Sequence, residues 1–273
     1  MNTKRKILFM DLDDTLLTHD KRLTQENADA ITRALEAGHL IVINTGRPLP
    51  GALPFLRRLH LDREGCFAIT YNGGLIYDPY HEKTLYKKSV PLPYVRHVFQ
   101  SAEAHGLYCQ TYSDKALLCK SPAEETGYYC SRNAIAWKAD PGLPDTLEEE
   151  PVKVLVINLH DRSRLEDYRR DIEPWAAGKL SIFFSSDYYL EHVAHGISKG
   201  GAIRFLCDYL KIPMEQTIAI GDAENDIPML EAAHIGIAVQ NASGPVKAAA
   251  DYVTASDCDH GAVSEAITKF MFF

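Results

Sequence analysis

The fold is decided by one stretch near the start of the chain, Ile7-Leu8-Phe9-Met10-Asp11-Leu12-Asp13-Asp14-Thr15-Leu16-Leu17. Its four leading apolar residues predict a short strand that is buried on both faces. Two acids follow, Asp11 and Asp13, and their alternation with Leu12 places them on one side of the chain. Ligands bind beyond the carboxyl ends of the strands in an open α/β sheet. The sequence therefore predicts both carboxylates at the mouth of such a sheet.

Two carboxylates this close together repel each other, and a divalent cation or a retained proton is the usual remedy. A solvated Asp-rich turn is the simpler interpretation of a lone Asp-x-Asp pair. Here Asp14-Thr15 and a return to apolar residues follow the pair, and this context favours a functional site.

The bulk composition is that of an ordinary globular protein, with 273 residues of which 46% are hydrophobic and 24% charged. A net charge of −8 with scattered basic residues argues against nucleic acid and anionic membranes as partners. No apolar run reaches membrane-spanning length. Six cysteines without a C-x-x-C pair predict free thiols and a cytoplasmic location.

The first segment of the chain alternates between strands and helices. Strands are predicted at residues 7–10, 40–43 and 67–70, and helices that begin near Thr24 and near Gly51 separate them. This rhythm predicts an α/β fold with a parallel, Rossmann-like sheet. Each strand runs into small or polar residues at the same edge of that sheet.

A different pattern begins near residue 83. Strand-like pieces lie close together, and an amphipathic helix is predicted at residues 164–177; this spacing favours an antiparallel sheet with helices on one face. The strand-like pieces are residues 106–111, 116–119, 153–159, 182–184 and 188–193. The alternation of helices and strands resumes after Gly196. We therefore predict a discontinuous core, residues 1–82 and 194–273, and an inserted α+β cap domain, residues 83–193.

Four polar clusters are predicted at the carboxyl edge of the core sheet. They are Asp11/Asp13, Thr45-Gly46-Arg47, Lys199 and Asp222/Asn225/Asp226. Each alone has a simpler explanation, because strand-end Asp and Thr-Gly are common in turns and a lone Lys is usually solvated. Together they supply what phosphoryl transfer requires: a carboxylate nucleophile, a second carboxyl as acid and base, oxygen ligands for Mg²⁺ and fixed donors for the phosphate.

This set resembles the haloacid dehalogenase (HAD) superfamily of Mg²⁺-dependent aspartyl phosphatases. The matching motifs are D-x-D-D-T-L at residues 11–16, T-G-R at 45–47, S-K-G at 198–200 and G-D-x-x-N-D at 221–226. With N-G-G at residues 72–74 and the large insert, the chain is similar to the Cof-type branch, whose cap is of the C2B kind. The resemblance spans the whole chain.

The resemblance implies a role for each matching residue. Asp11 is the expected nucleophile, Asp13 the expected general acid and base, and Lys199 the cation that neutralises Asp11. Thr45 and Lys199 are expected to hold the phosphate, and Asn225 to orient it. The implied Mg²⁺ ligands are Asp11, Asp13 through its backbone carbonyl, Asp222, and Asp226 through the waters of the metal.

Other residues lie where the Cof-type branch lines its pocket: Gly46, Arg47, Asn72 and Gly73. Arg47 has an alternative, a structural pair with an acid. His192 and His195, at the return from the insert, could meet substrate or a metal, although core or solvated histidines are the simpler interpretation. The chain departs from the branch at A-V-Q-N-A, residues 238–242, and at D-H-G-A-V, residues 259–263.

The expected function is hydrolysis of a small phosphorylated metabolite, such as a sugar phosphate or pyridoxal phosphate, with the cap as a lid that excludes water. Cap aromatics could stack on such a ring or simply form core. They are Tyr112, Tyr128, Tyr129, Trp137, Tyr188 and Tyr189. The alternatives are a sugar phosphomutase, a signalling receiver domain, which needs neither Asp13 nor a lid, and a catalytically idle binding protein. A monomer or homodimer is expected.

Overall fold

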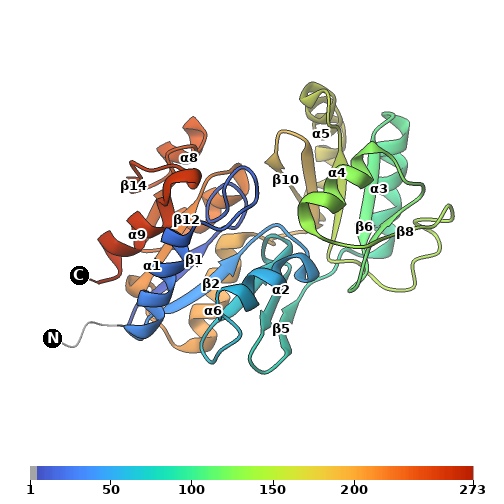
Figure 1. Ribbon diagram of the computed structural model, residues 1–273. Coiled ribbons are helices and arrows are strands. Elements are labelled where there is room, and N and C mark those ends of the chain that lie inside the picture. Colours follow the sequence, from blue (N-terminus) through green and yellow to red (C-terminus); the bar gives the residue numbers. More distant parts are fainter. Residues whose placement is uncertain (1–4, 273) are drawn as a thin grey trace.

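The computed structural model describes residues 5–272 and contains two β-sheets (Figure 1). Residues 1–4 and 273, which the sequence analysis assigned to the core, lie outside this range. The strand order is β14-β13-β12-β1-β2-β3-β4-β5 in the first sheet and β10-β11-β9-β6-β7-β8 in the second. Within residues 5–272, no helix combines the length and the apolar character that crossing a bilayer requires.

The first sheet is parallel from β14 to β3, and β4 and β5 form an antiparallel hairpin at its edge. Its strands are β1 (Ile7–Met10), β2 (Leu40–Asn44), β3 (Phe67–Thr70), β4 (Leu75–Asp78), β5 (Lys83–Lys87), β12 (Thr217–Gly221), β13 (Ile235–Ala238) and β14 (Tyr252–Val253). Strand β1 lies between β2 and β12, and all four of its side chains are buried. The predicted parallel sheet with a doubly buried first strand is therefore confirmed.

Helices cover both faces of this sheet, with α1 packed against α9 and α6 against α7. They are α1 (Gln25–Glu36), α2 (Leu49–Arg58), α6 (Lys199–Leu210), α7 (Ile227–Ala232), α8 (Gly244–Ala248) and α9 (Ala262–Phe270). The start of α1 is set as the sequence predicts, because the Thr24 side chain accepts a hydrogen bond from the Asn27 backbone N–H. Gly38 follows this helix with φ +84°, a conformation that favours glycine.

The second sheet is antiparallel except for the parallel pair β7–β8. Its strands are β6 (Tyr108–Tyr112), β7 (Leu117–Cys119), β8 (Trp137–Ala139), β9 (Lys153–Ile157), β10 (Leu180–Ser186) and β11 (Tyr189–Ala194). Side chains of β9 alternate between two clusters: Val154 and Val156 pack on one face, and Leu155 and Ile157 on the other.

Two helices, α3 (Leu92–Ala104) and α5 (Arg162–Ala176), cover the face that carries Val154 and Val156. A third, α4 (Glu124–Asn133), lies on the opposite face, in front of the sheet in Figure 1. The expectation of helices on one face only is therefore wrong. The sequence of α4 hides the helix, because Gly127 and few apolar residues leave no helical periodicity.

The two sheets also locate the segments that connect them. Strand β5 (Lys83–Lys87), expected at the start of the insert, pairs with β4 in the first sheet, so the second sheet is built from residues after β5. Strand β11, which ends at Ala194, leads directly toward α6. The chain therefore leaves the first sheet once and returns to it once.

Candidate active site

Residues of three neighbouring strands converge at the carboxyl edge of the first sheet. Asp11 follows β1, Thr45 follows β2 and Asp222 follows β12, and these strands are adjacent and parallel. The loops continue the strand hydrogen bonding, because the Asp11 N–H donates to the Ile220 carbonyl at 3.1 Å and the Thr45 N–H to the Ile69 carbonyl at 2.9 Å. The predicted meeting of these clusters is therefore seen in the structure.

Lys199 is the cation at the centre of this edge. It is the first residue of α6, whose start is capped by Ser198 Oγ, and its side chain is fully buried. Its Nζ lies 2.5 Å from Asp11 Oδ1 and 2.5 Å from Asp226 Oδ1. Burial by itself would lower the pKa of Lys199, but the two carboxylates outweigh it and raise the pKa. The ammonium therefore stays charged.

Three carboxylates gather here: Asp11, Asp222 and Asp226 have oxygens within 4.8 Å of one another. Both Asp226 oxygens are engaged, since Oδ2 accepts backbone N–H groups of Asp222 and Ala223 at 3.0 Å. Asp222 Oδ1 accepts the Thr15 hydroxyl at 2.7 Å.

The charges of this group do not balance. Burial raises the pKa of Asp11 to about 7, against the lowering effect of Lys199. Burial, together with Asp226 and Asp11, raises the pKa of Asp222 well above its ordinary value. Three acids with one ammonium leave excess negative charge on oxygen donors, which is the environment that Mg²⁺ prefers. The residues present therefore fit a magnesium ion.

Asp13 lines the same cavity as Asp11 but pairs with other cations. Arg47 forms a bidentate ion pair with Asp13, with Nε 2.7 Å from Oδ2 and Nη2 2.7 Å from Oδ1. Lys21 Nζ lies 3.2 Å from Asp13 Oδ1. Burial alone would raise the pKa of Asp13, but the hydrogen bonds and charges of Arg47 and Lys21 outweigh it and lower the pKa to about 2. Arg47 therefore pairs with an acid, as the alternative had it, and it also lines the cavity, as the resemblance implied.

Asn72 and Asn225 are in direct contact, because Asn225 Nδ2 donates to Asn72 Oδ1 at 2.8 Å. A Cβ on Gly46 would lie 3.0 Å from Asn72 Oδ1, so glycine permits this close approach. Gly73 has φ +100°, and a Cβ there would lie 2.4 Å from the Ser198 carbonyl oxygen. Asn225 and Gly46 line the cavity described next, whereas Asn72 and Gly73 do not.

A cavity of about 160 Å³ opens between the two sheets above Asp11. The first-sheet unit lines it with Asp11, Asp13, Asp14, Lys21, Thr45, Gly46, Arg47, Asp222, Ala223 and Asn225. The second-sheet unit lines it with Tyr128, Tyr129, Arg132, Asn133, Lys153, Ser185, Ser186, Tyr188, Tyr189 and Glu191. Sequence reasoning missed Lys21, Arg132, Lys153 and Glu191. Lys153 alone left a signal, as a charge directly before the apolar run 154–157.

Lys153, which lines this cavity, connects the second sheet to the loop that contains Gly46. Its Nζ donates to the Gly46 carbonyl at 2.8 Å and lies 2.9 Å from Glu191 Oε2. Both side chains are almost fully buried, and Ser185 Oγ donates to Glu191 Oε1 at 2.7 Å. Since a buried lysine needs such partners, this contact fixes the second sheet against the Gly46 loop.

Four of the six aromatic candidates line the cavity: Tyr128, Tyr129, Tyr188 and Tyr189. The hydroxyl of Tyr189 is buried without a hydrogen-bond partner in the described part of the chain. Tyr112 packs into the core beside Tyr129, and Trp137 is 47% exposed.

The two histidines at the return from the insert lie elsewhere. His192 is buried, with Nε2 3.2 Å from the Tyr168 hydroxyl, and burial lowers its pKa to about 3, so the ring is neutral. His195 is exposed. Neither ring lines the cavity.

Comparison with known proteins identifies a family whose model matches most of this chain. Residues 8–267 match the family model described as haloacid dehalogenase-like hydrolase. The chain is 32% identical to the Streptococcus pyogenes protein M6_Spy0533, over 97% of this chain and 98% of that protein. It is 29% identical to the pyridoxal phosphate phosphatase YbhA of Escherichia coli, over 98% and 97%. A solved HAD subclass IIB sugar phosphatase, BT4131, superposes with a TM-score of 0.83 at 26% identity, over 97% and 98%.

Proposed function

The chain belongs to the haloacid dehalogenase-like hydrolases and is a phosphatase of that type, and we propose that it uses Mg²⁺ to hydrolyse a small phosphorylated metabolite through an aspartyl-phosphate. The observation that carries this proposal is the placement of Lys199 Nζ, 2.5 Å from both Asp11 and Asp226 at the mouth of the sheet. A buried ammonium there holds the Asp11 carboxylate in place and meets the charge of an incoming phosphate.

Asp11 is the proposed nucleophile. One carboxylate oxygen attacks phosphorus in line, the bond from phosphorus to the leaving oxygen breaks, and the phosphoryl group passes to Asp11. Thr45 and Lys199 hold the phosphate oxygens, and Asn225 orients them. Mg²⁺ would be held by Asp11, Asp222 and the backbone carbonyl of Asp13, with Asp226 acting through the waters of the metal, and it would supply positive charge against the phosphate oxygens.

Asp13 is the proposed proton carrier. As an acid it gives a proton to the leaving oxygen, and as a base it then takes one from the water that cleaves the acyl-phosphate. Its pair with Arg47 favours the ionised carboxylate, which is the form needed for the base step. For the acid step Arg47 must turn to another anion, and the phosphate of the substrate is the anion that enters beside it.

The substrate is proposed to be a sugar phosphate or pyridoxal phosphate. Tyrosines 128, 129, 188 and 189 line the cap side of the cavity, and their rings can stack on a flat or puckered ring. Relatives named as a pyridoxal phosphate phosphatase and a sugar phosphatase support this class.

The six-stranded unit is proposed to act as the lid, a cap of the C2B kind, with residues 83–193 as its extent apart from the β5 hairpin strand. A cytoplasmic location and a monomeric or homodimeric state stay predictions.

Phosphate release measures this function directly. The protein is assayed with sugar phosphates, pyridoxal phosphate, nucleotides and an aryl phosphate, with Mg²⁺ and with EDTA, and the Asp11→Asn variant is the blank. Release that needs Mg²⁺ and is absent in the blank supports the proposal. Full activity in EDTA would refute the metal assignment. Isomerised sugar without released phosphate would indicate a mutase, and silence on all compounds would favour a binding protein.

A further inference from the structure

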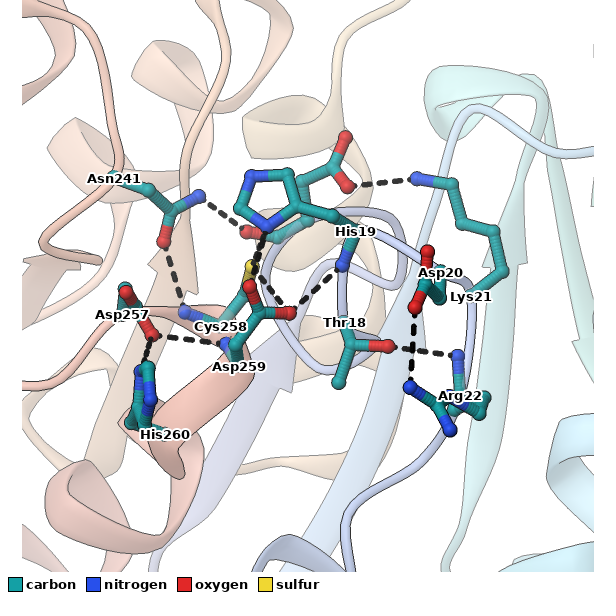
Figure 2. A network of polar contacts seen from close by, with 11 residues as sticks. Thr18, His19, Asp20, Lys21, Arg22, Asn241, Asp257, Cys258, Asp259 and His260 are labelled. Atoms are coloured by element: carbon teal, nitrogen blue, oxygen red, sulfur yellow. Dashed lines mark hydrogen bonds and ion pairs between the residues drawn. The ribbon is translucent and has the colours of Figure 1, made fainter.

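A second cluster of metal-ligating side chains includes residues of the loop between β1 and α1, apart from the carboxylates near Lys199. It joins the loop of Asp14 and His19 to the loop of Cys258, which precedes α9 (Figure 2). One ligand atom from each of the three residues lies within 4.8 Å of the other two. Within residues 5–272, it is the one such group that contains a thiol or an imidazole.

The sulfur-to-nitrogen separation matches that around a single ion. Cys258 Sγ lies 3.4 Å from His19 Nδ1 and 4.0 Å from Asp259 Oδ1. In a tetrahedral zinc site, sulfur at about 2.3 Å and nitrogen at about 2.0 Å from the metal are about 3.5 Å apart. Asp259 Oδ2 lies 2.8 Å from the same His19 nitrogen, so a fourth ligand atom is at hand.

Neighbouring hydrogen bonds hold the two loops in this arrangement. Asn241 spans them: its Nδ2 donates to the Asp14 carbonyl at 2.8 Å, and its Oδ1 accepts the Cys258 N–H at 2.9 Å. The His19 N–H donates to Asp259 Oδ1 at 3.0 Å. Figure 2 shows Asn241, His19, Cys258 and Asp259 turned toward one another. Outer contacts of this kind orient the ligands of metal sites.

We propose that Asp14, His19 and Cys258 bind one Zn²⁺ ion, with Asp259 or a water as the fourth ligand. On binding, the thiol releases its proton to solvent and the thiolate bonds to the metal. His19 Nδ1, which donates to Asp259 Oδ2, gives up its proton to solvent while Nε2 carries the proton of the neutral ring, so the Nδ1 lone pair becomes a ligand. Lys21 Nζ lies 2.8 Å from Asp14 Oδ1, and the carboxylate has a second oxygen for the ion. Thiolate and imidazole ligands select zinc over Mg²⁺, which prefers oxygen ligands alone.

Cobalt substitution tests the site without an activity assay. The protein, in excess Mg²⁺ that keeps the carboxylate group occupied, is titrated with Co²⁺ and followed by near-ultraviolet absorption. We expect a thiolate-to-cobalt charge-transfer band that saturates at one equivalent and that one equivalent of Zn²⁺ abolishes. The group of Asp11, Asp222 and Asp226 contains no sulfur and cannot give this band.

Two variants and two matched controls locate the ligands. His19→Asn and Cys258→Ser should lose the band; the His19 side chain is 58% exposed, so its replacement leaves the fold intact even if that of buried Cys258 does not. His260→Asn, which alters a neighbouring imidazole paired with Asp257, and Cys130→Ser, which alters a free thiol on α4, should keep it. Absence of the band in the unaltered protein, or its survival in His19→Asn, would overturn the site.

Discussion

Asp13 shows how much the behaviour of one residue depends on contacts that are distant in sequence. The D-x-D motif predicts a second carboxyl beside Asp11, and both residues line the cavity in the structure. The bidentate ion pair between Asp13 and Arg47 could not be predicted from the sequence, because it forms only when the fold brings the loops after β1 and β2 together. The pair sets the charge state of the carboxyl, and this is what the sequence alone left open.

Replacing Arg47 by Met should make the free energy of unfolding depend less steeply on pH in the acid range. The folded pKa of Asp13, about 2, lies below its ordinary value of 3.8, so the pair stabilises the fold fully above about pH 4 and loses this effect as the pH falls toward 2. We expect Arg47→Met to cost on the order of 1–2 kcal/mol at pH 6, since the carboxyl is a third exposed and water screens the pair.

Urea unfolding of both proteins at pH 6 and pH 3 measures this effect. The difference between them should shrink at pH 3, because the unaltered protein then loses part of the stabilisation. A difference that is equal at both pH values would contradict the assignment to Asp13.

Asp11→Asn should abolish phosphate release and leave the fold at least as stable. Burial raises the folded pKa of Asp11 to about 7, so without metal the acid costs stability progressively as the pH rises from about 4 to about 7. The neutral amide removes that cost. Thermal unfolding in EDTA at pH 5 and pH 8 should therefore show a larger advantage for the variant at pH 8, and residual turnover would remove Asp11 from the role of nucleophile.

At the scale of elements, hydrophobic periodicity predicted the strands and helices around β1. It did not predict the short and polar helix α4. The β–α alternation of the first sheet could be predicted because its strands are buried on both faces and therefore form apolar runs in the sequence. Helix α4 could not be predicted from the sequence, although it supplies Tyr128, Tyr129, Arg132 and Asn133 to the cavity. Its few apolar side chains, such as Tyr129, contact both the cavity and the second sheet, and the rest of the helix is polar, so no apolar stripe of helical period results.

Gly200→Ala tests how tightly α6 must approach α7 to place Lys199. A Cβ at Gly200 would lie 2.0 Å from the Pro228 carbonyl oxygen, so α6 must shift. We expect a loss of about 1–3 kcal/mol in the free energy of unfolding and a lower kcat, because Lys199 is the preceding residue.

The matched control for this change is Gly127→Ala in α4. A Cβ there has nothing within 4 Å, and alanine should stabilise the helix by about 0.5–1 kcal/mol. Chemical denaturation and steady-state kinetics check both variants. A Gly200→Ala protein with unaltered stability would show that α6 and α7 tolerate a wider separation.

At the scale of the whole molecule, the active site is completed by both sheets, and Lys153 is their buried link. Lys153→Met would leave Glu191 as an unpaired buried charge, so we expect a loss of about 3–5 kcal/mol. The double variant Lys153→Met/Glu191→Met removes both charges and should regain most of that stability. It should still have a lower kcat/KM, because the bond to the Gly46 carbonyl is gone.

Denaturation of the single and double variants, together with their kinetics on an aryl phosphate, separates the two effects. If the double variant is as unstable as the single one, the cost does not come from the unpaired carboxylate. The sequence could not predict this link, because Lys153 and Glu191 belong to strands that pair only in the folded second sheet.

The central position of β1 has a consequence for synthesis on the ribosome. Strand β1 leaves the ribosome first, yet one of its two neighbours, β12, is made only after the whole second sheet. Until then its apolar edge has no partner on that side, whereas the six-stranded unit already has all its strands. Nascent chains halted before Thr217 therefore carry a complete second sheet beside an unfinished first sheet, and we expect chaperones to retain them through the open edge of β1.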